Sequence, residues 1–153
     1  MSDTTSQAPS GAPEDVNRRR LSRDECDEML SRPIVGVFSS LAASGWIHSV
    51  PVHFLYRDGE VRILCGTGSV KASNVDHTGR GTLCVEVTNG SERRFVTVEG
   101  PTRVQRPARP EDVTALDERY SRSDTADWTE SEYASEAVLV LRPTRWIAWS
   151  DWD

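Results

Sequence analysis

Lysine is almost missing from this sequence of 153 residues: Lys71 stands alone beside 17 arginines. An arginine bias of this kind is typical of coding in a GC-rich genome. Where lysine persists against this bias, the position is a candidate for one that requires a compact, flexible ammonium group. Lysine binds phosphate as a point charge, whereas arginine presents a planar fork. The plainer interpretation, a single surviving surface lysine, stays open from composition alone.

Long hydrophobic runs are also missing, and so is a positive net charge. No apolar stretch approaches the roughly 18 residues of a membrane span, and the N-terminus lacks the apolar core of a signal peptide. The net charge of −6 and the pI near 5.1 disfavour nucleic acid as the main partner, because binding to phosphate backbones requires a basic surface. We therefore expect a cytoplasmic protein that binds neither membrane nor nucleic acid.

Cysteine and histidine are too few and too scattered for a disulfide framework or a zinc site. Cys26, Cys65 and Cys84 form no CxxC pair, and their odd number indicates reduced, buried thiols. His48 and His53 are five residues apart in one expected strand, so they should point to opposite faces. This spacing does not match the usual ligand patterns, and no metal is predicted.

The first 20 residues are rich in Ser, Thr, Pro, Ala and Gly and end in Arg18-Arg19-Arg20. Such a composition cannot bury enough apolar surface to fold by itself. We predict a disordered N-terminal tail over residues 1–20 and one domain over residues 21–153. The arginine triplet is interpreted as a solvated run or, alternatively, as a lid or tether for an anionic ligand.

Runs of β-branched and aromatic residues alternate with turn signals through most of the sequence. Pro51 places its strand at an edge or bulge, Asp58-Gly59 is a hairpin turn, and Gly100-Pro101 predicts a bulge or sharp corner. Closely spaced strands with short links predict a mainly β fold, in which about six to seven antiparallel strands form a barrel with peripheral helices. The expected strands cover residues 34–38, 46–56, 61–65, 82–87, 94–105 and 137–149, the last with a break at Pro143.

Helix signals lie outside these strands. Ser22 and Glu25 form a capping box that begins a helix to about Leu30. A helix begins at Pro110, with proline at its first position, and Asp127 is expected to cap a further short helix with Glu130 at the box position. One helical turn is expected at residues 70–75.

Lys71 lies in a small, polar, glycine-containing segment, Gly66-Thr67-Gly68-Ser69-Val70-Lys71-Ala72-Ser73-Asn74, directly after an expected strand. Hydroxyl donors beside a single ammonium are suited to binding a phosphate group. Ser69 and Asn74 have an alternative interpretation, since such side chains also cap helical turns.

The ordered set of motifs resembles the pyridoxamine-phosphate-oxidase-like split barrels, which are similar to FMN-binding proteins. The resemblance covers about residues 21–149. It depends on Ser49-Val50-Pro51-Val52 at the end of one strand, Ser69-x-Lys71-x-x-Asn74 after another, and Phe95-Val96-Thr97-Val98-Glu99-Gly100 in a later one. The resemblance implies a split barrel that assembles as a homodimer, with two cofactor sites between the subunits.

The resemblance also implies which residues hold the cofactor. Thr67, Gly68, Ser69 and Lys71 should hold its phosphate, and Asn74 should brace that loop or reach the phosphate. The backbone near Ser49, Val50 and Pro51 should lie along the ring system, unless Pro51 serves only as an edge-strand device.

Two features of the sequence bear on the cofactor and the reaction. The chain stops at Ser150-Asp151-Trp152-Asp153, without the C-terminal arginine motif of pyridoxamine-phosphate oxidase, so oxidation of vitamin B6 is not expected. The single-lysine phosphate loop is more similar to the shorter relatives that use the deazaflavin coenzyme F420. The resemblance then implies hydride transfer between F420 and a small unsaturated organic substrate. An FMN-dependent oxidoreductase and a non-catalytic flavin, haem or tetrapyrrole binder are the alternatives.

Other residues have open roles at this point. His48, beside the segment expected to bind the ring, is either a proton donor or a structural histidine. Trp146 and Trp149 are three apart in an expected strand and should face opposite sides, one toward the core or dimer interface and the other toward a partner's cofactor pocket. An F420 tail would require a basic groove, for which Arg57, Arg62, Arg80 or the Arg18–Arg20 run are candidates.

Overall fold

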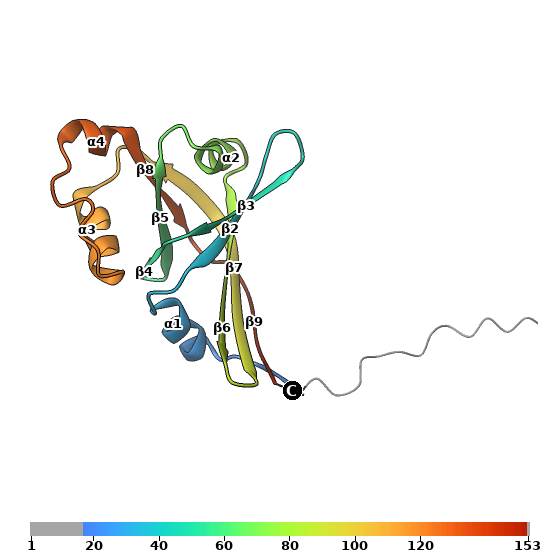
Figure 1. Ribbon diagram of the computed structural model, residues 1–153. Coiled ribbons are helices and arrows are strands. Elements are labelled where there is room, and N and C mark those ends of the chain that lie inside the picture. Colours follow the sequence, from blue (N-terminus) through green and yellow to red (C-terminus); the bar gives the residue numbers. More distant parts are fainter. Residues whose placement is uncertain (1–16, 153) are drawn as a thin grey trace, which may run out of the picture.

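The computed structural model describes residues 17–152, which form one mainly antiparallel β structure with four helices (Figure 1). Helix α1 lies at one end of the strands, α2 lies at the other end, and α3 and α4 lie outside β5 and β8. The elements in chain order are β1 (Asn17–Arg20), α1 (Arg23–Leu30), β2 (Gly36–Leu41), β3 (Ile47–Val52), β4 (Leu55–Arg57), β5 (Glu60–Gly66), α2 (Val70–Thr78), β6 (Arg80–Asn89), β7 (Glu92–Gln105), α3 (Pro110–Arg119), α4 (Glu130–Ser135), β8 (Glu136–Leu141) and β9 (Arg145–Trp152).

The nine strands form a sheet that curls but does not close. Its order is β3-β2-β6-β7-β8-β5-β4, and β9 pairs with β7 and with β1. Strands β3 and β4 are the two ends of this path, although only His53 and Phe54 separate them along the chain. We call the gap between β3 and the β4–β5 hairpin the seam, and it is the split of the predicted split barrel.

Strand β7 joins the two parts of the sheet because it bends at Gly100-Pro101. Before the bend it pairs with β9, from Glu92 to Glu99, and after the bend it pairs with β8, from Thr102 to Gln105. A Cβ atom on Gly100 would lie 2.1 Å from the carbonyl oxygen of Arg142, so only glycine fits this crossing. The corner predicted at Gly100-Pro101 is therefore confirmed.

The main core lies between the inward faces of the strands and is closed at its two ends by helices. Met29 and Leu30 of α1 and Ala72 and Val75 of α2 are fully or almost fully buried in it. A second, smaller cluster forms where α3 and α4 cover the other face of β5 and β8. Its buried members are Ala108, Val113, Val138 and Val140, with Leu64, Trp128 and Tyr133 packed against them.

Local signals explain most helix ends and turns. The Ser22 hydroxyl accepts a hydrogen bond from the Glu25 N–H at 3.2 Å, and the Glu25 carboxylate accepts one from the Ser22 N–H at 2.8 Å, so the predicted capping box is confirmed. Asp58 and Gly59 both have positive φ, 54° and 73°, as the predicted hairpin turn requires. The helix predicted from Pro110 is also confirmed.

Three sequence-based predictions differ from the structure. The single strand expected over residues 46–56 is wrong, because the chain crosses the seam at His53 and Phe54 and continues as β4 beside β5. The cap expected at Asp127 is wrong, because Thr129 caps α4 and forms the box with Glu132. The helix expected at 70–75 runs on to Thr78, where Gly79 ends it with a left-handed φ of 67°.

The boundary expected at residue 20 also differs. Asn17–Arg20 form β1, which pairs in register with the last residues of β9, and Arg18 and Arg19 bond to Asp151 and Glu25. Residues 1–16 lie outside the described residues, so the predicted tail stays a prediction there. With β1 and the separate β4, the structure has nine strands where about six to seven were expected, while the mainly β, split-barrel class is confirmed.

Candidate cofactor site at the seam

A cavity of about 360 Å³ lies at the seam. Strand β3 contributes Pro51 and Val52 to its lining, and β5 contributes Leu64. Lys71, in the first turn of α2, lines the same cavity. The fold therefore brings two of the predicted site segments, the end of β3 and the lysine segment, to one hollow, although 20 residues separate Pro51 from Lys71 in the sequence.

The seam edge of β3 carries backbone groups that no strand of residues 17–152 satisfies. In an antiparallel pair, hydrogen-bonded residue pairs alternate with pairs that share no hydrogen bond. The Ala42 N–H donates to the Trp46 carbonyl, so that pair is hydrogen-bonded. Counting along the strands, Phe38 and Val50 form a hydrogen-bonded pair, and Ser39 and Ser49 do not. The backbone N–H and C=O of Ser49 and the C=O of Pro51 therefore point away from β2, toward the open edge. Pro51 has no N–H, and nothing in the hairpin is lost by its presence there.

The first turn of α2 is suited to binding an anion. Helix α2 has nine residues and no acidic side chain in its first turn, and its unpaired N–H groups lie beside Gly68 and Ser69. The Lys71 ammonium is half-buried and forms no ion pair with any residue from 17 to 152. Positive charge from the side chain and from the helix terminus therefore coincide at this end of the cavity.

Hydrogen bonds of Ser69, Asn74 and Arg106 hold the segment around Lys71 in place. The Ser69 hydroxyl accepts a hydrogen bond from the Ala72 N–H at 3.3 Å, so its capping role is confirmed. Buried Asn74 donates to the Ser40 hydroxyl at 3.1 Å and so ties α2 to β2. The Arg106 guanidinium donates to the Thr67 carbonyl at 2.9 Å and pairs with Asp76 at 2.8 Å, which fixes the loop to α2. Arg106 was not predicted, since it lies 39 residues from Thr67.

Two ionisable groups near Lys71, the Glu136 carboxyl and the Cys65 thiol, have raised pKa values. Burial raises the pKa of the Glu136 carboxyl, and the positive charge of Lys71 offsets part of this rise. Burial also raises the pKa of the Cys65 thiol, although the contact with Ser69 and the charge of Lys71 act in the opposite direction. A protonated thiol is a poor nucleophile, so Cys65 is suited to packing and not to covalent chemistry.

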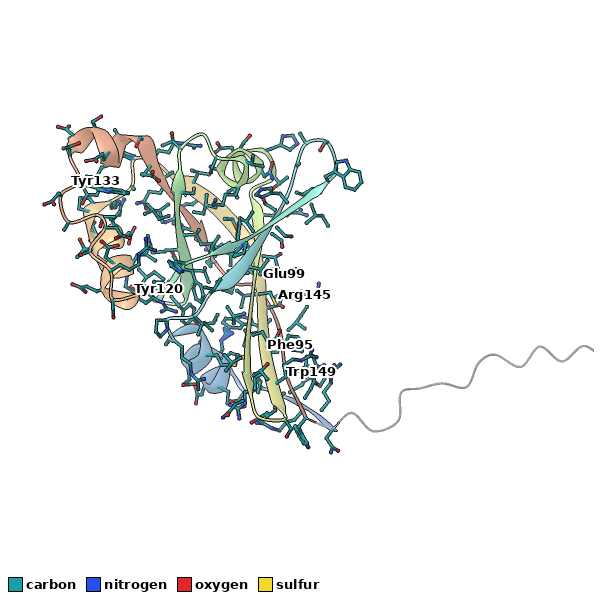
Figure 2. The ribbon with its side chains drawn as sticks, in the orientation of Figure 1. Phe95, Glu99, Tyr120, Tyr133, Arg145 and Trp149 are labelled. Carbon is teal, nitrogen blue, oxygen red and sulfur yellow. The ribbon has the colours of Figure 1, made fainter. Side chains whose placement is uncertain are left out.

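The far wall of the cavity comes from the segment between α3 and α4, which the sequence did not point to. The Tyr120 ring stacks on His53 with centroids 4.1 Å apart and planes at 15°. Its hydroxyl donates to the Ile34 carbonyl at 2.8 Å and accepts from the Phe54 N–H at 3.0 Å, which locks the chain as it crosses the seam. Figure 2 shows Tyr120 at the end of α3, close to β4.

One of the two ring nitrogens of His53 forms a hydrogen bond with Arg122. Arg122 Nη1 lies 3.0 Å from His53 Nδ1, and a guanidinium can only donate, so Nδ1 accepts and the ring proton resides on Nε2. His53, Tyr120 and Arg122 all line the cavity, together with Asp117, Asp124 and Trp128. His48, weighed as a proton donor from the sequence, is not among the lining residues, and its Nδ1 is buried without a hydrogen-bond partner among the described residues.

Several predicted residues lie apart from the cavity. The Ser49 hydroxyl bonds to Ser39 at 2.8 Å on the outer face of the β2–β3 hairpin, and the Val50 side chain packs against the core, so only their backbones can follow the seam edge. Arg57 and Arg62 both bond to buried Asp112, at 2.6 and 3.1 Å. These two arginines are therefore engaged by one buried carboxylate and do not form a free basic groove.

Comparisons with known proteins agree with this architecture. A family model described as pyridoxamine 5'-phosphate oxidase matches residues 22–150. The chain belongs to this family. The match covers the whole seam cavity, from β3 to the α3–α4 segment, and confirms the resemblance expected from the motifs.

Solved structures with this fold are distant in sequence. An F420 reductase is 20% identical, with 79% of this chain and 94% of that chain covered and a TM-score of 0.66. A FAD-binding protein from Mesorhizobium loti is 17% identical, with coverages of 90% and 99% and a TM-score of 0.71. The FAD and haem binding protein from Mycobacterium smegmatis is 19% identical, with coverages of 89% and 73% and a TM-score of 0.71. Among curated proteins, no sequence matches this chain.

The described residues form neither a helix suited to span a membrane nor a cluster of metal ligands. No helix within residues 17–152 combines the length and the apolar composition needed to cross a membrane. In the same part of the chain, no three His, Cys, Asp or Glu side chains converge as metal ligands would.

Proposed function

We propose that this protein is a reductase that uses coenzyme F420 and acts on a small unsaturated organic substrate. The observation that carries the proposal is the seam cavity, where the unpaired Lys71 ammonium and the first turn of α2 lie at one end and the open edge of β3 runs along one side. A ligand with a phosphate and a flat, hydrogen-bonding ring system matches both features. The F420 reductase among proteins of this fold supports the choice of cofactor.

Each part of the site would have a separate task in holding the cofactor. Lys71 and the N–H groups at the start of α2 would bind the phosphate, with the Thr67 hydroxyl as a further donor. The open backbone groups of Ser49 and Pro51 would bind the polar edge of the ring system. Asn74 and Arg106 would hold the loop in place from behind.

The chemistry that such a cofactor supplies when bound is hydride transfer. The chain's own residues would position the substrate and hold a proton. Because Arg122 bonds to Nδ1, His53 presents an Nε2–H that can donate to a substrate oxygen in the cavity. Tyr120 would keep the imidazole plane fixed by stacking on it.

A homodimer is part of the proposal. The outer face of the β2–β3 hairpin exposes Val35, Val37, Leu41 and Ile47, with exposed fractions from 41% to 71%. Pairing in the hairpin puts Val37 beside Pro51 and Leu41 beside Ile47. The Ser39–Ser49 pair, whose hydroxyls bond to each other, lies between these two apolar pairs, and we call the whole face the apolar strip. A second copy of the chain would cover this strip and bring a partner surface close to β3.

The test is a cofactor titration of the purified protein. F420 and FMN are titrated separately and binding is followed by their fluorescence, after an absorption spectrum of the protein as isolated. Binding of F420 with no measurable binding of FMN supports the proposal. Preference for FMN would move the function to a flavin-dependent oxidoreductase, and a Soret band in the isolated protein would identify a haem or tetrapyrrole binder instead.

A further inference from the structure

A second hollow, separate from the seam, follows the outer edge of β9 and has a volume of about 520 Å³. We call it the arginine groove. Arg20, Arg23 and Arg145 line it together with Trp146 and Trp149. Among the described residues, no Asp or Glu contributes to the lining, although the whole chain has a net charge of −6. A concave, positively charged site on an acidic protein attracts anions.

Two of the three guanidinium groups are held in place by tryptophan rings. Arg23 lies over Trp146 at 3.6 Å from the ring centroid, and Arg20 lies over Trp149 at 5.0 Å. Stacking uses the face of a guanidinium and leaves the N–H groups on its edge available to an anion. Because these side chains are already ordered, an anion that binds them costs less conformational entropy.

Nearby carboxylates neutralise only part of the positive charge of the groove. Arg20 has no carboxylate partner among residues 17–152, and Asp27 is 3.8 Å from Arg23. Arg145 is paired with Glu99 at 2.8 Å, across β9 and β7 (Figure 2). The groove therefore keeps room for at least one further anionic partner.

The backbone edge of β9 is open along the groove. Strand β1 pairs only with Trp149–Trp152, and the Leu21 N–H donates to the Ala148 carbonyl at 3.2 Å. Since backbone direction alternates along a strand, the N–H and C=O of Trp146 point to the same side as the Ala148 carbonyl. No strand of the described structure covers that position. Strand β9 thus offers a short free edge next to three cations.

The geometry points to a binding site for a short, extended, acidic peptide chain. Such a chain can add to the free edge of β9 at Trp146, as strands add to sheet edges in peptide recognition. Its side chains would alternate between the two faces of the sheet. Arg20 and Arg145 lie on the outer face with Trp149, while Arg23 lies beside inward-facing Trp146, so carboxylates on both faces find a cation. This inference does not depend on the proposed function of the seam.

The experiment is a calorimetric titration of the full chain with an N-acetylated, C-amidated tetraglutamate peptide. The tetraglutamine and tetralysine peptides serve as controls of the same length. We expect tetraglutamate to bind, tetralysine not to bind, and tetraglutamine to bind at least about tenfold more weakly. Added salt should weaken the tetraglutamate complex, since the groove is open to solvent.

Variants locate the binding. The double variant Arg20→Gln, Arg23→Gln should lose at least about tenfold in affinity. Arg32→Gln should bind as the parent does, because Arg32 pairs with Glu28 on α1 and does not line the groove. Lys71→Ala should also bind tetraglutamate normally, which separates this site from the seam.

Several results would overturn the inference. These are the absence of tetraglutamate binding, an unchanged affinity in the double variant, or loss of binding in Lys71→Ala, which would place the peptide at the seam. If the double variant folds poorly, backbone amide shifts of the parent protein decide the matter: tetraglutamate should move the signals of Trp146 and Ala148, and failure to move them contradicts binding at the edge of β9.

Discussion

Lys71 combines three properties: partial burial, a place in the first turn of a helix, and no ion-pair partner within residues 17–152. The helix N-terminus would favour the same anion that the ammonium binds. Removing the side chain should therefore affect a bound phosphate much more than it affects the fold.

Lys71→Ala should weaken cofactor binding by about 1.5–3 kcal/mol, the size of a charge-assisted contact, or roughly 10- to 150-fold in Kd. The fluorescence titration used for the parent measures this directly. Arg32→Ala removes a cation outside the cavity and should leave the Kd unchanged. Equal affinities for Lys71→Ala and the parent would show that the phosphate lies elsewhere.

Glu25 gives a pH dependence that can be assigned to one side chain. The hydrogen bond from Arg19, with that from the Ser22 N–H, lowers the pKa of Glu25 from 4.5 to about 2. A carboxyl with a lowered pKa stabilises the fold above its unfolded pKa, and that contribution disappears as the pH falls from about 4.5 through 2. The capping box of α1 should therefore weaken in acid.

Glu25→Gln should be less stable than the parent at neutral pH, and the difference should shrink as the pH falls toward 2. The free energy of unfolding, measured by urea at several pH values, reports it. Glu130→Gln serves as the control, since Glu130 forms no ion pair within the described residues. A difference between Glu25→Gln and the parent that stays constant down to pH 2 would contradict the assignment.

Tyr120 connects residues that are 66 and 86 positions away in the chain. Tyr120→Phe leaves the buried Phe54 N–H without its partner and should lower the free energy of unfolding by about 1–3 kcal/mol. Tyr133→Phe is the matched control, because the Tyr133 ring packs edge-on to Trp128 and its hydroxyl has no bond to a described residue. Chemical denaturation measures the free energy of unfolding of both variants. An equal decrease in the two variants would show that the Tyr120 hydroxyl does not stabilise the crossing at the seam.

At the scale of the elements, β7 determines the shape of the sheet because it serves both parts of it. The strand turns at Gly100, where the chain of residues 142–144 passes close by, and the Arg142 and Thr144 N–H groups bond to the Pro101 and Glu99 carbonyls. The sequence signal for this corner was local, and it was sufficient.

Gly100→Ala should lower the free energy of unfolding by at least about 1–3 kcal/mol, because its Cβ would lie 2.1 Å from a backbone oxygen that cannot move aside easily. Gly66→Ala, also at a strand position, meets no atom within 4 Å and should be nearly neutral. Thermal or urea unfolding distinguishes the two variants. If the free energy of unfolding is the same for both variants, the crossing at Gly100 has room for a Cβ atom, contrary to the structure.

The element boundaries that sequence patterns missed have non-local causes. The run from Trp46 to Tyr56 is uniformly strand-like, so nothing within it reveals that Phe54 is fixed by Tyr120 and that the chain there leaves one side of the seam for the other. Asn17–Arg20 have the composition of a tail, but β9 provides their hydrogen bonds and Asp151 provides a partner for Arg18.

At the scale of the whole molecule, the apolar strip on the β2–β3 hairpin is the feature that a single chain leaves open. Ile47 is 71% exposed, and Trp46 at the tip of the hairpin is 80% exposed. In a protein with a net charge of −6, an uncovered strip of this kind is expected to meet another apolar surface.

Ile47→Glu should convert the proposed dimer into a monomer, because it places a charge inside the covered strip. It should also weaken cofactor binding if the sites lie between subunits. Light scattering during size-exclusion chromatography measures the mass. Ala134→Glu, which adds the same charge at an exposed position on α4, outside β8, is the control for the mass measurement. A parent protein that runs as a monomer would remove the dimer from the proposal.

The sequence by itself determined the local features: the Ser22–Glu25 box, the Asp58-Gly59 turn, the Gly100-Pro101 corner and the position of Lys71 after a strand. Each depends on residues within a few positions of one another, where sterics and hydrogen bonding are readable from composition. Only the tertiary structure decided what surrounds Lys71. Tyr120 and Arg122 bond to residues 66 and 69 positions away, and packing of α3 and α4 against β5 and β8 brings them to the seam. Arg106 reaches the loop before Lys71 from 39 positions away. The same is true of the arginine groove, which exists because β1 covers only the last part of the edge of β9.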